Sequence, residues 1–116
     1  MASASPSPEL RKLYRALRIV RTAIDPLVPT QMVQAFLAVA LTEGHTLTEI
    51  AEVLGTNIST ASRQLLDLGE RNRRMEPGYQ LVESRADPMN LRTNRYTLSP
   101  KGRMLAKELV DILKEA

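Results

Sequence analysis

The chain contains 116 residues, which fits one domain, because a single hydrophobic core usually forms in chains of about 100 to 150 residues. Hydrophobic residues make up 43% and charged residues 25%, so the chain is predicted to fold rather than to be disordered as a whole. It has no cysteine and one histidine, His45, which excludes disulfides, thiol chemistry and a Cys/His zinc site within one chain. We therefore expect no enzyme, no catalytic residue, no metal site and no cofactor.

No segment of the sequence is typical of a membrane protein, since it has no run of about 18 apolar residues. The start, from Met1 to Pro8, lacks the basic and long apolar parts of a secretory signal, and residues 1–7 are predicted to be a flexible tail. The expectation is a soluble, cytoplasmic protein without a membrane partner.

Positive charge falls in two blocks of a chain whose net charge is +3. Residues 9–25 carry five Lys or Arg against two acids, and residues 57–103 carry nine against five, whereas residues 26–56 carry three acids and no base. Clustering of this kind favours a polyanionic partner. The alternative is that the charges form solvated faces.

Two helices are predicted in the first 42 residues. The Ser-Pro-Glu sequence at 7–9 supplies an N-cap, a proline suited to the first turn and an acid in that turn, and Pro26 ends the helix. This helix should span residues 8–25. A second helix over residues 30–42 is apolar nearly all round, which marks it as the buried central element.

The next stretch predicts two short helices joined by a tight turn. Thr46 and Glu49 have the spacing of a capping box, which marks a helix start. Gly55 tolerates the left-handed turn that ends this helix, and Asn57 is a suitable N-cap for a second helix over 58–68. Together they are a helix-turn-helix candidate.

The pattern then changes to a hairpin and a last helix. A polar connector at 69–78 is followed by two predicted strands at 79–85 and 94–98, and the loop between them, 86–93, is too long for a two-residue turn. Ser-Pro at 99–100 begins a last helix with an apolar stripe at helical spacing. The chain is thus predicted to be mainly α with a small β-hairpin.

The predicted helix 58–68 has a polar side suited to duplex DNA. On a helical wheel Ser59, Thr60 and Arg63 lie opposite the apolar side, and Gln64 lies at the border. Short side chains let a helix approach the bases, and arginine can donate two hydrogen bonds to guanine. The alternative is a solvated polar face.

The predicted hairpin adds basic and polar residues beside this helix. They are Asn90, Arg92, Thr93, Asn94 and Arg95. A basic hairpin next to a helix-turn-helix can place an arginine in the negative potential of the adjacent minor groove.

Four stretches of the sequence carry a family resemblance: TLTEIAEVLG at 46–55, STASRQLLD at 59–67, DPMNLR at 87–92 and YTLSPKGR at 96–103. They resemble the MarR family of winged-helix transcription regulators, over a region from about Val28 to Leu109. The resemblance implies a winged helix-turn-helix domain at 26–98, with a reading helix over about 58–68 and a wing over about 79–98. It also implies that the terminal helices, 8–25 and 99–116, are dimerisation helices.

In that family the helix after the turn enters the major groove and an arginine of the wing enters the minor groove. The resemblance implies a homodimeric, sequence-specific regulator of transcription, a repressor, that binds double-stranded DNA at a near-palindromic site. The residues assigned to base contact are Ser59, Thr60, Arg63 and Gln64. Those assigned to wing contact are Asn90, Arg92, Thr93 and Arg95. Those assigned to phosphate contact are Thr46, Asn57, Arg73 and Arg74.

The chain departs from the family pattern at three places. Asn90 stands where the family usually has an aspartate that pairs with the wing arginine, Gln64 stands at a position that is more often apolar, and the connector 69–78 is longer than usual. The last helix is also short for a dimerisation element.

The first and last helices each carry an apolar stripe that is predicted to lie in a dimer interface. The residues assigned to it are Leu10, Leu13, Leu17, Leu105, Leu109 and Ile112. The alternative is that the stripes pack inside one chain. For function, the alternative is a winged helix that binds another protein without sequence-specific DNA binding, because fold alone does not determine function. No small-molecule effector can be named from the sequence.

Overall fold

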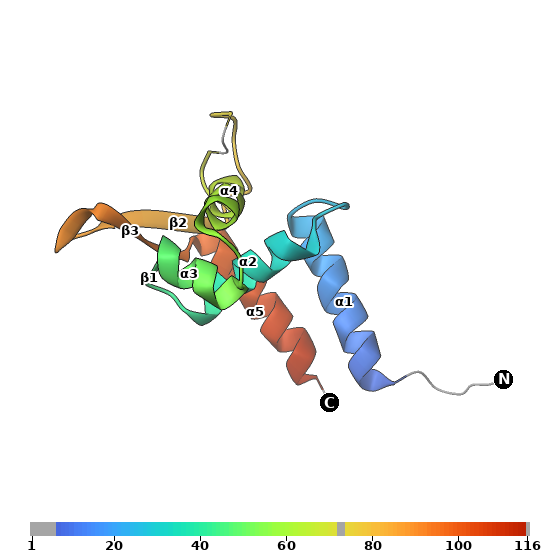
Figure 1. Cartoon of the computed structure of the whole chain (residues 1–116). Helices are drawn as coiled ribbons and strands as arrows, with labels where there is room; N and C mark the ends of the chain where they lie inside the picture. Colours follow the sequence, from blue (N-terminus) through green and yellow to red (C-terminus); the bar gives the residue numbers. More distant parts are fainter. Residues whose placement is uncertain (1–6, 72–73, 116) are drawn as a thin grey trace.

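The structure is a computed structural model that describes residues 7–71 and 74–115. The described residues form five helices and a three-stranded sheet (Figure 1). In chain order the elements are α1 (Pro8–Ala23), α2 (Thr30–Leu41), β1 (His45–Thr46), α3 (Leu47–Leu54), α4 (Ile58–Leu68), β2 (Val82–Asp87), β3 (Asn90–Leu98) and α5 (Pro100–Lys114). The tail predicted at 1–7, apart from Ser7, lies outside the described residues, as does Arg73.

Local signals in the sequence set the starts of the helices as predicted. The side-chain oxygens of Ser7, Thr46, Asn57 and Ser99 each accept a backbone N–H in the first turn of α1, α3, α4 and α5. In α3 the capping box is complete, since Glu49 in turn accepts the N–H of Thr46 at 2.9 Å. These caps satisfy N–H groups that have no partner within their own helix.

Helix α2 is the centre of the core, as its apolar sequence predicted. Phe36 and Val39 are fully buried, and α2 packs against α3, α4, β3 and α5. Ile50 from α3 and Leu68 from α4 are also fully buried, together with Leu81 just before β2. The helix-turn-helix pair and the base of the hairpin are thus held on one scaffold.

The sheet has the strand order β1-β3-β2, with both pairs antiparallel. Strand β1 was not predicted from the sequence; its two residues pair with Tyr96 and Arg95 of β3 and so attach the hairpin to the start of α3. The β2–β3 hairpin, called the wing below, extends away from the helices (Figure 1).

The turn of the wing is shorter than the loop expected at 86–93. Strand β2 continues to Asp87 and β3 begins at Asn90, so residues 88–89 alone form the turn. A longer loop was predicted because this stretch contains Asn, Asp and Pro, which commonly form turns. The prediction was wrong because strand formation here depends on pairing with the partner strand, which residue type does not indicate.

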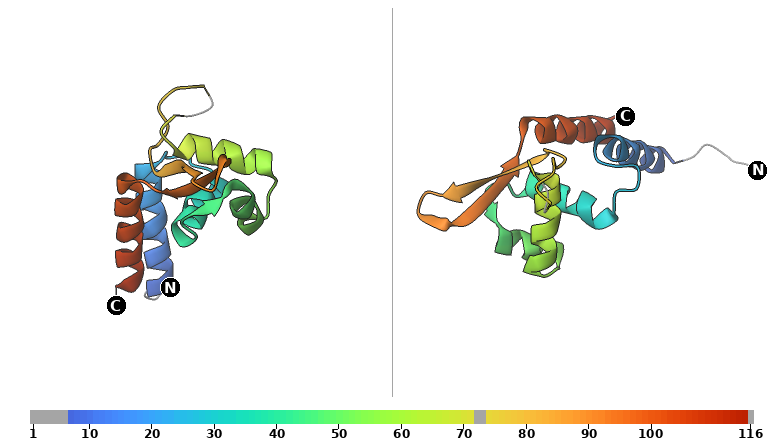
Figure 2. Two further views of the ribbon diagram at one scale, coloured as in Figure 1. Left: turned by 90° about the vertical axis from the view of Figure 1, so that its left-hand side faces the viewer. Right: turned by 90° about the horizontal axis from the view of Figure 1, so that it is seen from above.

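Helices α1 and α5 lie side by side and run antiparallel (Figure 2). Leu105, Leu109 and Ile112 of α5 are buried inside the chain, whereas Leu10, Leu13 and Leu17 of α1 are exposed. The assignment of those three α5 residues to a dimer interface is therefore corrected. An apolar stripe predicts that a helix face is covered but does not identify the covering surface, which here includes Ala16 and Val20 of α1.

Candidate nucleic-acid interface

The turn between α3 and α4 is built around Gly55. Its φ is +68° and its ψ is 33°, a left-handed conformation that glycine adopts without steric cost. Asn57 follows and caps α4 by accepting the N–H of Thr60 on Oδ1 at 2.8 Å. The turn and cap fix the direction in which α4 leaves α3.

Helix α4 buries one side and presents the other to solvent. Ala61, Leu65 and Leu68 are buried, whereas Ser59 and Arg63 are exposed and Thr60 is half-buried. Within residues 7–71 and 74–115, the guanidinium of Arg63 makes no hydrogen bond or ion pair. The outer face of α4 therefore presents the small hydroxyl group of Ser59 and the guanidinium of Arg63, whose five N–H donors can bind a partner.

Gln64 differs from the other residues assigned to base contact. It is half-buried, and its Nε2 donates to Oε1 of Gln31 in α2 at 3.2 Å. Its amide is thus already engaged at the contact between two helices, so it lies at the edge of the exposed face, as the helical wheel predicted.

The phosphate-contact candidates Thr46 and Asn57 both use their side-chain oxygens as helix caps. Oγ1 of Thr46 accepts the N–H of Glu49 at 3.3 Å, and the N–H of Thr46 in turn holds the pKa of the Glu49 carboxyl below its usual range. These two side chains therefore shape the starts of α3 and α4.

The connector supplies the other phosphate-contact candidates. Arg74 is exposed, and Arg73 lies outside the described residues. Arg71, which was not assigned, donates to the carbonyl of Met75 at 3.1 Å and forms an isolated bridge with Pro77, which closes the connector into a loop.

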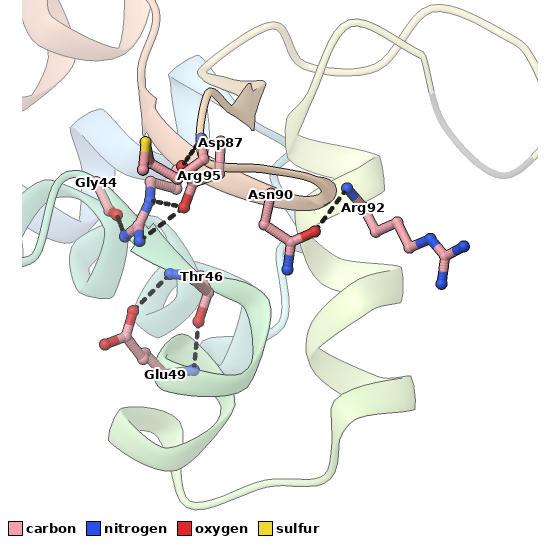
Figure 3. A network of polar contacts seen from close by, with 8 residues as sticks. Gly44, Thr46, Glu49, Asp87, Asn90, Arg92 and Arg95 are labelled. Carbon is pink, nitrogen blue, oxygen red and sulfur yellow. Dashed lines mark hydrogen bonds and ion pairs between the residues drawn. The ribbon is translucent and has the colours of Figure 1, made fainter.

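The tip of the wing is held by two short side-chain contacts (Figure 3). Oδ1 of Asp87 accepts the N–H of Met89 at 2.8 Å, and Oδ1 of Asn90 accepts the N–H of Arg92 at 3.2 Å. Asn90, the first residue of β3, thus binds the backbone N–H of Arg92 rather than its guanidinium.

Arg95 connects the wing to the residues before α3. Its Nε and Nη2 both lie 3.0 Å from Oδ2 of Asp87, and its Nη1 donates to the carbonyl of Gly44 at 2.8 Å. The N–H of Met89 and, after it, Arg95 hold the pKa of the Asp87 carboxyl below its usual range. Arg95 was assigned to wing contact with DNA, but its guanidinium is engaged inside the chain.

Within the described residues, Arg92 and Arg85 are the wing arginines whose guanidinium groups have no hydrogen bond or ion pair. The ladder is irregular here, because Asp87 pairs with Asn90 while the next pair is Ala86 with Asn94, so residues 91–93 bulge from β3. In Figure 3 the Arg92 side chain points away from the Asp87–Arg95 pair, and within the described residues its guanidinium has no partner. Thr93, also assigned to the wing, is half-buried.

Neither Asp87 nor Gly44 was predicted from the sequence to be a partner of Arg95. The only signal was the eight-residue spacing of Asp87 and Arg95 in a predicted hairpin, and it becomes informative only when the strand register is known. The Gly44 contact has no local signal, because 51 residues separate the two partners.

The described part of the chain contains no group of three or more His, Cys, Asp or Glu residues that could hold a metal ion. None of the helices found in residues 7–71 and 74–115 is both long and apolar enough to cross a bilayer.

No protein-family model and no curated protein matches the sequence. Solved structures do match over most of the chain. A MarR family transcription regulator has a TM-score of 0.61 at 23% identity, with 87% of this chain and 63% of that chain covered. The repressor CouR, bound to a 23-mer DNA duplex, has a TM-score of 0.63 at 24% identity, with 90% and 66% covered. FabT from Streptococcus pneumoniae, in complex with DNA, has a TM-score of 0.64 at 14% identity, with 90% and 71% covered.

The chain thus spans less than two thirds of the length of the first two of these proteins. The described residues of this chain include a helix-turn-helix, a wing and contact between α1 and α5. The chain has the winged helix-turn-helix fold of the MarR-family transcription regulators.

Proposed function

We propose that this protein is a sequence-specific, double-stranded DNA-binding transcription regulator that places α4 in the major groove and the wing in the adjacent minor groove. The observation that carries the proposal is the outer face of α4, where Ser59 is exposed and the Arg63 guanidinium has no partner in the described part of the chain. A small side chain permits close approach to base edges, and a free guanidinium can bind O6 and N7 of guanine.

Two of the similar structures support this proposal. CouR and FabT were both solved with DNA, and they share the fold over 90% of this chain. In this chain Arg92 is the wing residue suited to the minor groove, because its side chain is exposed and uncommitted on the bulge of β3.

Phosphate contact would come from backbone and basic side chains around the reading surface. The N-termini of α3 and α4 carry the positive ends of the helix dipoles, and the caps at Thr46 and Asn57 orient them. Arg73 and Arg74 in the connector would add charge. Contacts of this kind set the register of a protein on DNA without selecting its sequence.

The proposal includes a homodimer formed by the terminal helices. Leu10, Leu13 and Leu17 of α1 are 46% to 66% exposed, and Val110 and Leu113 of α5 are 47% and 54% exposed. Exposed apolar side chains on two adjacent helices suit a self-complementary two-fold interface. Such a dimer would place two reading helices about 34 to 36 Å apart, one turn of DNA, and would require a near-palindromic site. The protein would act as a repressor where such a site overlaps a promoter.

The first test is to remove the guanidinium of Arg63. Selection from a random duplex pool by the wild type defines the preferred site, and Arg63→Ala should bind that site about 10- to 100-fold more weakly and lose preference at one base pair per half-site. Arg11→Ala, which removes the same charge from α1, serves as the control and should keep the preference.

Unchanged affinity and base preference in Arg63→Ala would show that α4 does not read the major groove. A wild type that binds no duplex at low salt would instead favour the protein-binding winged helix. Repression is tested separately with a reporter gene placed behind the selected site.

A further inference from the structure

The tip of the wing is apolar and exposed. Met89 is 92% exposed and Leu91 is 77% exposed, and they lie on either side of Asn90. Neither side chain is among the residues that pack against the core. Large apolar side chains placed at the end of a projecting hairpin are suited to contact with something outside the chain.

The chain holds this tip in a fixed conformation. Pro88 restricts the backbone of the turn, and Asp87 and Asn90 accept the N–H groups of Met89 and Arg92. Asp87 is itself fixed by Arg95, which also binds the carbonyl of Gly44 ahead of α3 (Figure 3). The apolar side chains are therefore carried on an anchored backbone, which lowers the entropy cost of inserting them into a partner.

The charges around the tip indicate a polyanionic partner. Arg92 lies beside Leu91, and Arg85 of β2 is exposed opposite Arg95 in the strand register. Within the described residues the guanidinium groups of Arg85 and Arg92 have no partner. The carboxylate nearest the tip, Asp87, is paired with Arg95. An apolar tip flanked by free cations matches a minor groove, whose walls are phosphates and whose floor is formed by stacked bases.

We propose that Met89 and Leu91 form a wedge that enters the minor groove, partly unstacks one base step and bends the DNA. This inference rests on the DNA-binding function proposed above and deepens it. The wedge gives the wing a sequence preference of its own. Pyrimidine–purine steps such as TA and CA unstack easily and are favoured under the tip, whereas stiff A-tract steps are disfavoured.

The proposal is tested by measuring the bend of a bound duplex. The probe is the duplex selected by the wild type from a random pool, with a donor and an acceptor dye at its ends, so that bending raises energy transfer. The wild type should bend it by about 20 to 90°, the range produced by apolar wedges. The double variant Met89→Ala/Leu91→Ala should bind with little bend and with about 10-fold lower affinity, because apolar surface no longer leaves water.

Leu27→Ala is the matched control, since Leu27 is 87% exposed in the segment between α1 and α2. It should leave both bend and affinity unchanged. TA and CA steps in the flanks of the selected site are replaced by AA one at a time. Replacement at one position per half-site should weaken binding by the wild type. The same replacement should not change binding by the double variant.

Two results would overturn the wedge. The wild type could bind the duplex and leave it straight, or the double variant could bend it as much as the wild type does. If the double variant in that second case also loses self-association in sedimentation, the tip is assigned to contact with a second copy of the chain. Absence of any duplex binding by the wild type at low salt is a separate failure, which removes the proposed function itself.

Discussion

Arg92 and Arg95 lie three positions apart in the same strand and have different roles. Arg95 binds Asp87 and the Gly44 carbonyl, whereas the Arg92 guanidinium is uncommitted within the described residues. Residue type alone did not distinguish them, and both were assigned to DNA contact from the sequence. The difference arises from strand register, which brings Asp87 to Arg95 and leaves Arg92 on a bulge.

The Asp87–Arg95 contact makes wing stability depend on pH. The folded-state pKa of Asp87 is depressed below the ordinary value of 3.8, first by the N–H of Met89 and then by Arg95. A depressed carboxyl contributes stability that is fully present above its unfolded pKa and is lost as pH falls through the folded pKa. Asp87→Asn should therefore lower the free energy of unfolding at pH 7, and the difference from wild type should shrink on acidification below pH 3.8.

Urea unfolding at a series of pH values measures this difference. Glu83→Gln, on the same strand, removes a carboxylate that has no hydrogen bond or ion pair within the described residues, and it should change stability less at pH 7. If the difference in the free energy of unfolding between Asp87→Asn and wild type stays constant across the acid range, the charge of Asp87 does not stabilise the wing.

The starts of the helices were predictable because their signals are local. The helix predicted at 58–68 is observed as Ile58–Leu68, and Ser99 and Pro100 mark the start of α5 as expected. A cap and its helix lie within four residues, so the sequence window contains the whole interaction.

The pairing of β1 in the sheet and the burial of the apolar side of α5 were not predictable in the same way. Strand β1 is two residues long and exists only through pairing with β3, about 50 positions later. The burial of Leu105 and Leu109 within one chain depends on the path of α1. Both features are fixed by contacts between distant segments, which local propensity and periodicity do not contain.

Gly55 and Gly102 help to position these elements for different physical reasons. Substitutions can distinguish the two reasons. A Cβ at Gly102 in α5 would lie 2.1 Å from the carbonyl oxygen of Leu81, so Gly102→Ala must push α5 away from the base of the wing. Gly55 has open space around it but a φ of +68°. In denaturant unfolding, Gly102→Ala should cost about 1 to 3 kcal/mol through overpacking, and Gly55→Ala about 1 to 2 kcal/mol through backbone strain.

Asparagine at the same positions distinguishes the two causes. Because asparagine tolerates the left-handed region, Gly55→Asn should be more stable than Gly55→Ala. Gly102→Asn should be no better than Gly102→Ala. Wild-type stability in Gly102→Ala would contradict the close approach of α5 to Leu81.

Helix α5 contacts two parts of the molecule, the wing at its start and α1 at its end. Its start packs beneath the wing, where Oγ of Ser99 donates to the carbonyl of Gln80 at 2.6 Å. Its end lies against α1, where Arg15 and Glu115 form an exposed ion pair at 2.7 Å. A dimer formed through α1 and α5 would therefore fix the spacing of two reading helices through a continuous helix.

The dimer is tested with leucines that are exposed in the single chain. Leu13→Glu and Leu113→Glu place a charge on the proposed interface and should shift the protein from dimer to monomer in sedimentation equilibrium at micromolar concentration. Leu41→Glu is the control, because Leu41 is 82% exposed at the end of α2. A wild type that stays monomeric and still binds a palindrome tightly would contradict a preformed dimer.

Binding of duplex DNA by the surface formed by α4 and the wing is measured by an equilibrium titration of the selected duplex across salt concentrations. Because phosphate neutralisation releases counterions, the affinity should fall by about 1,000-fold or more between 50 mM and 200 mM salt. Within that series Arg63→Ala should bind the selected site about 10- to 100-fold more weakly than the wild type at each salt concentration. Absence of binding at 50 mM, or an affinity that does not change with salt, would show that this surface does not bind the phosphates of duplex DNA.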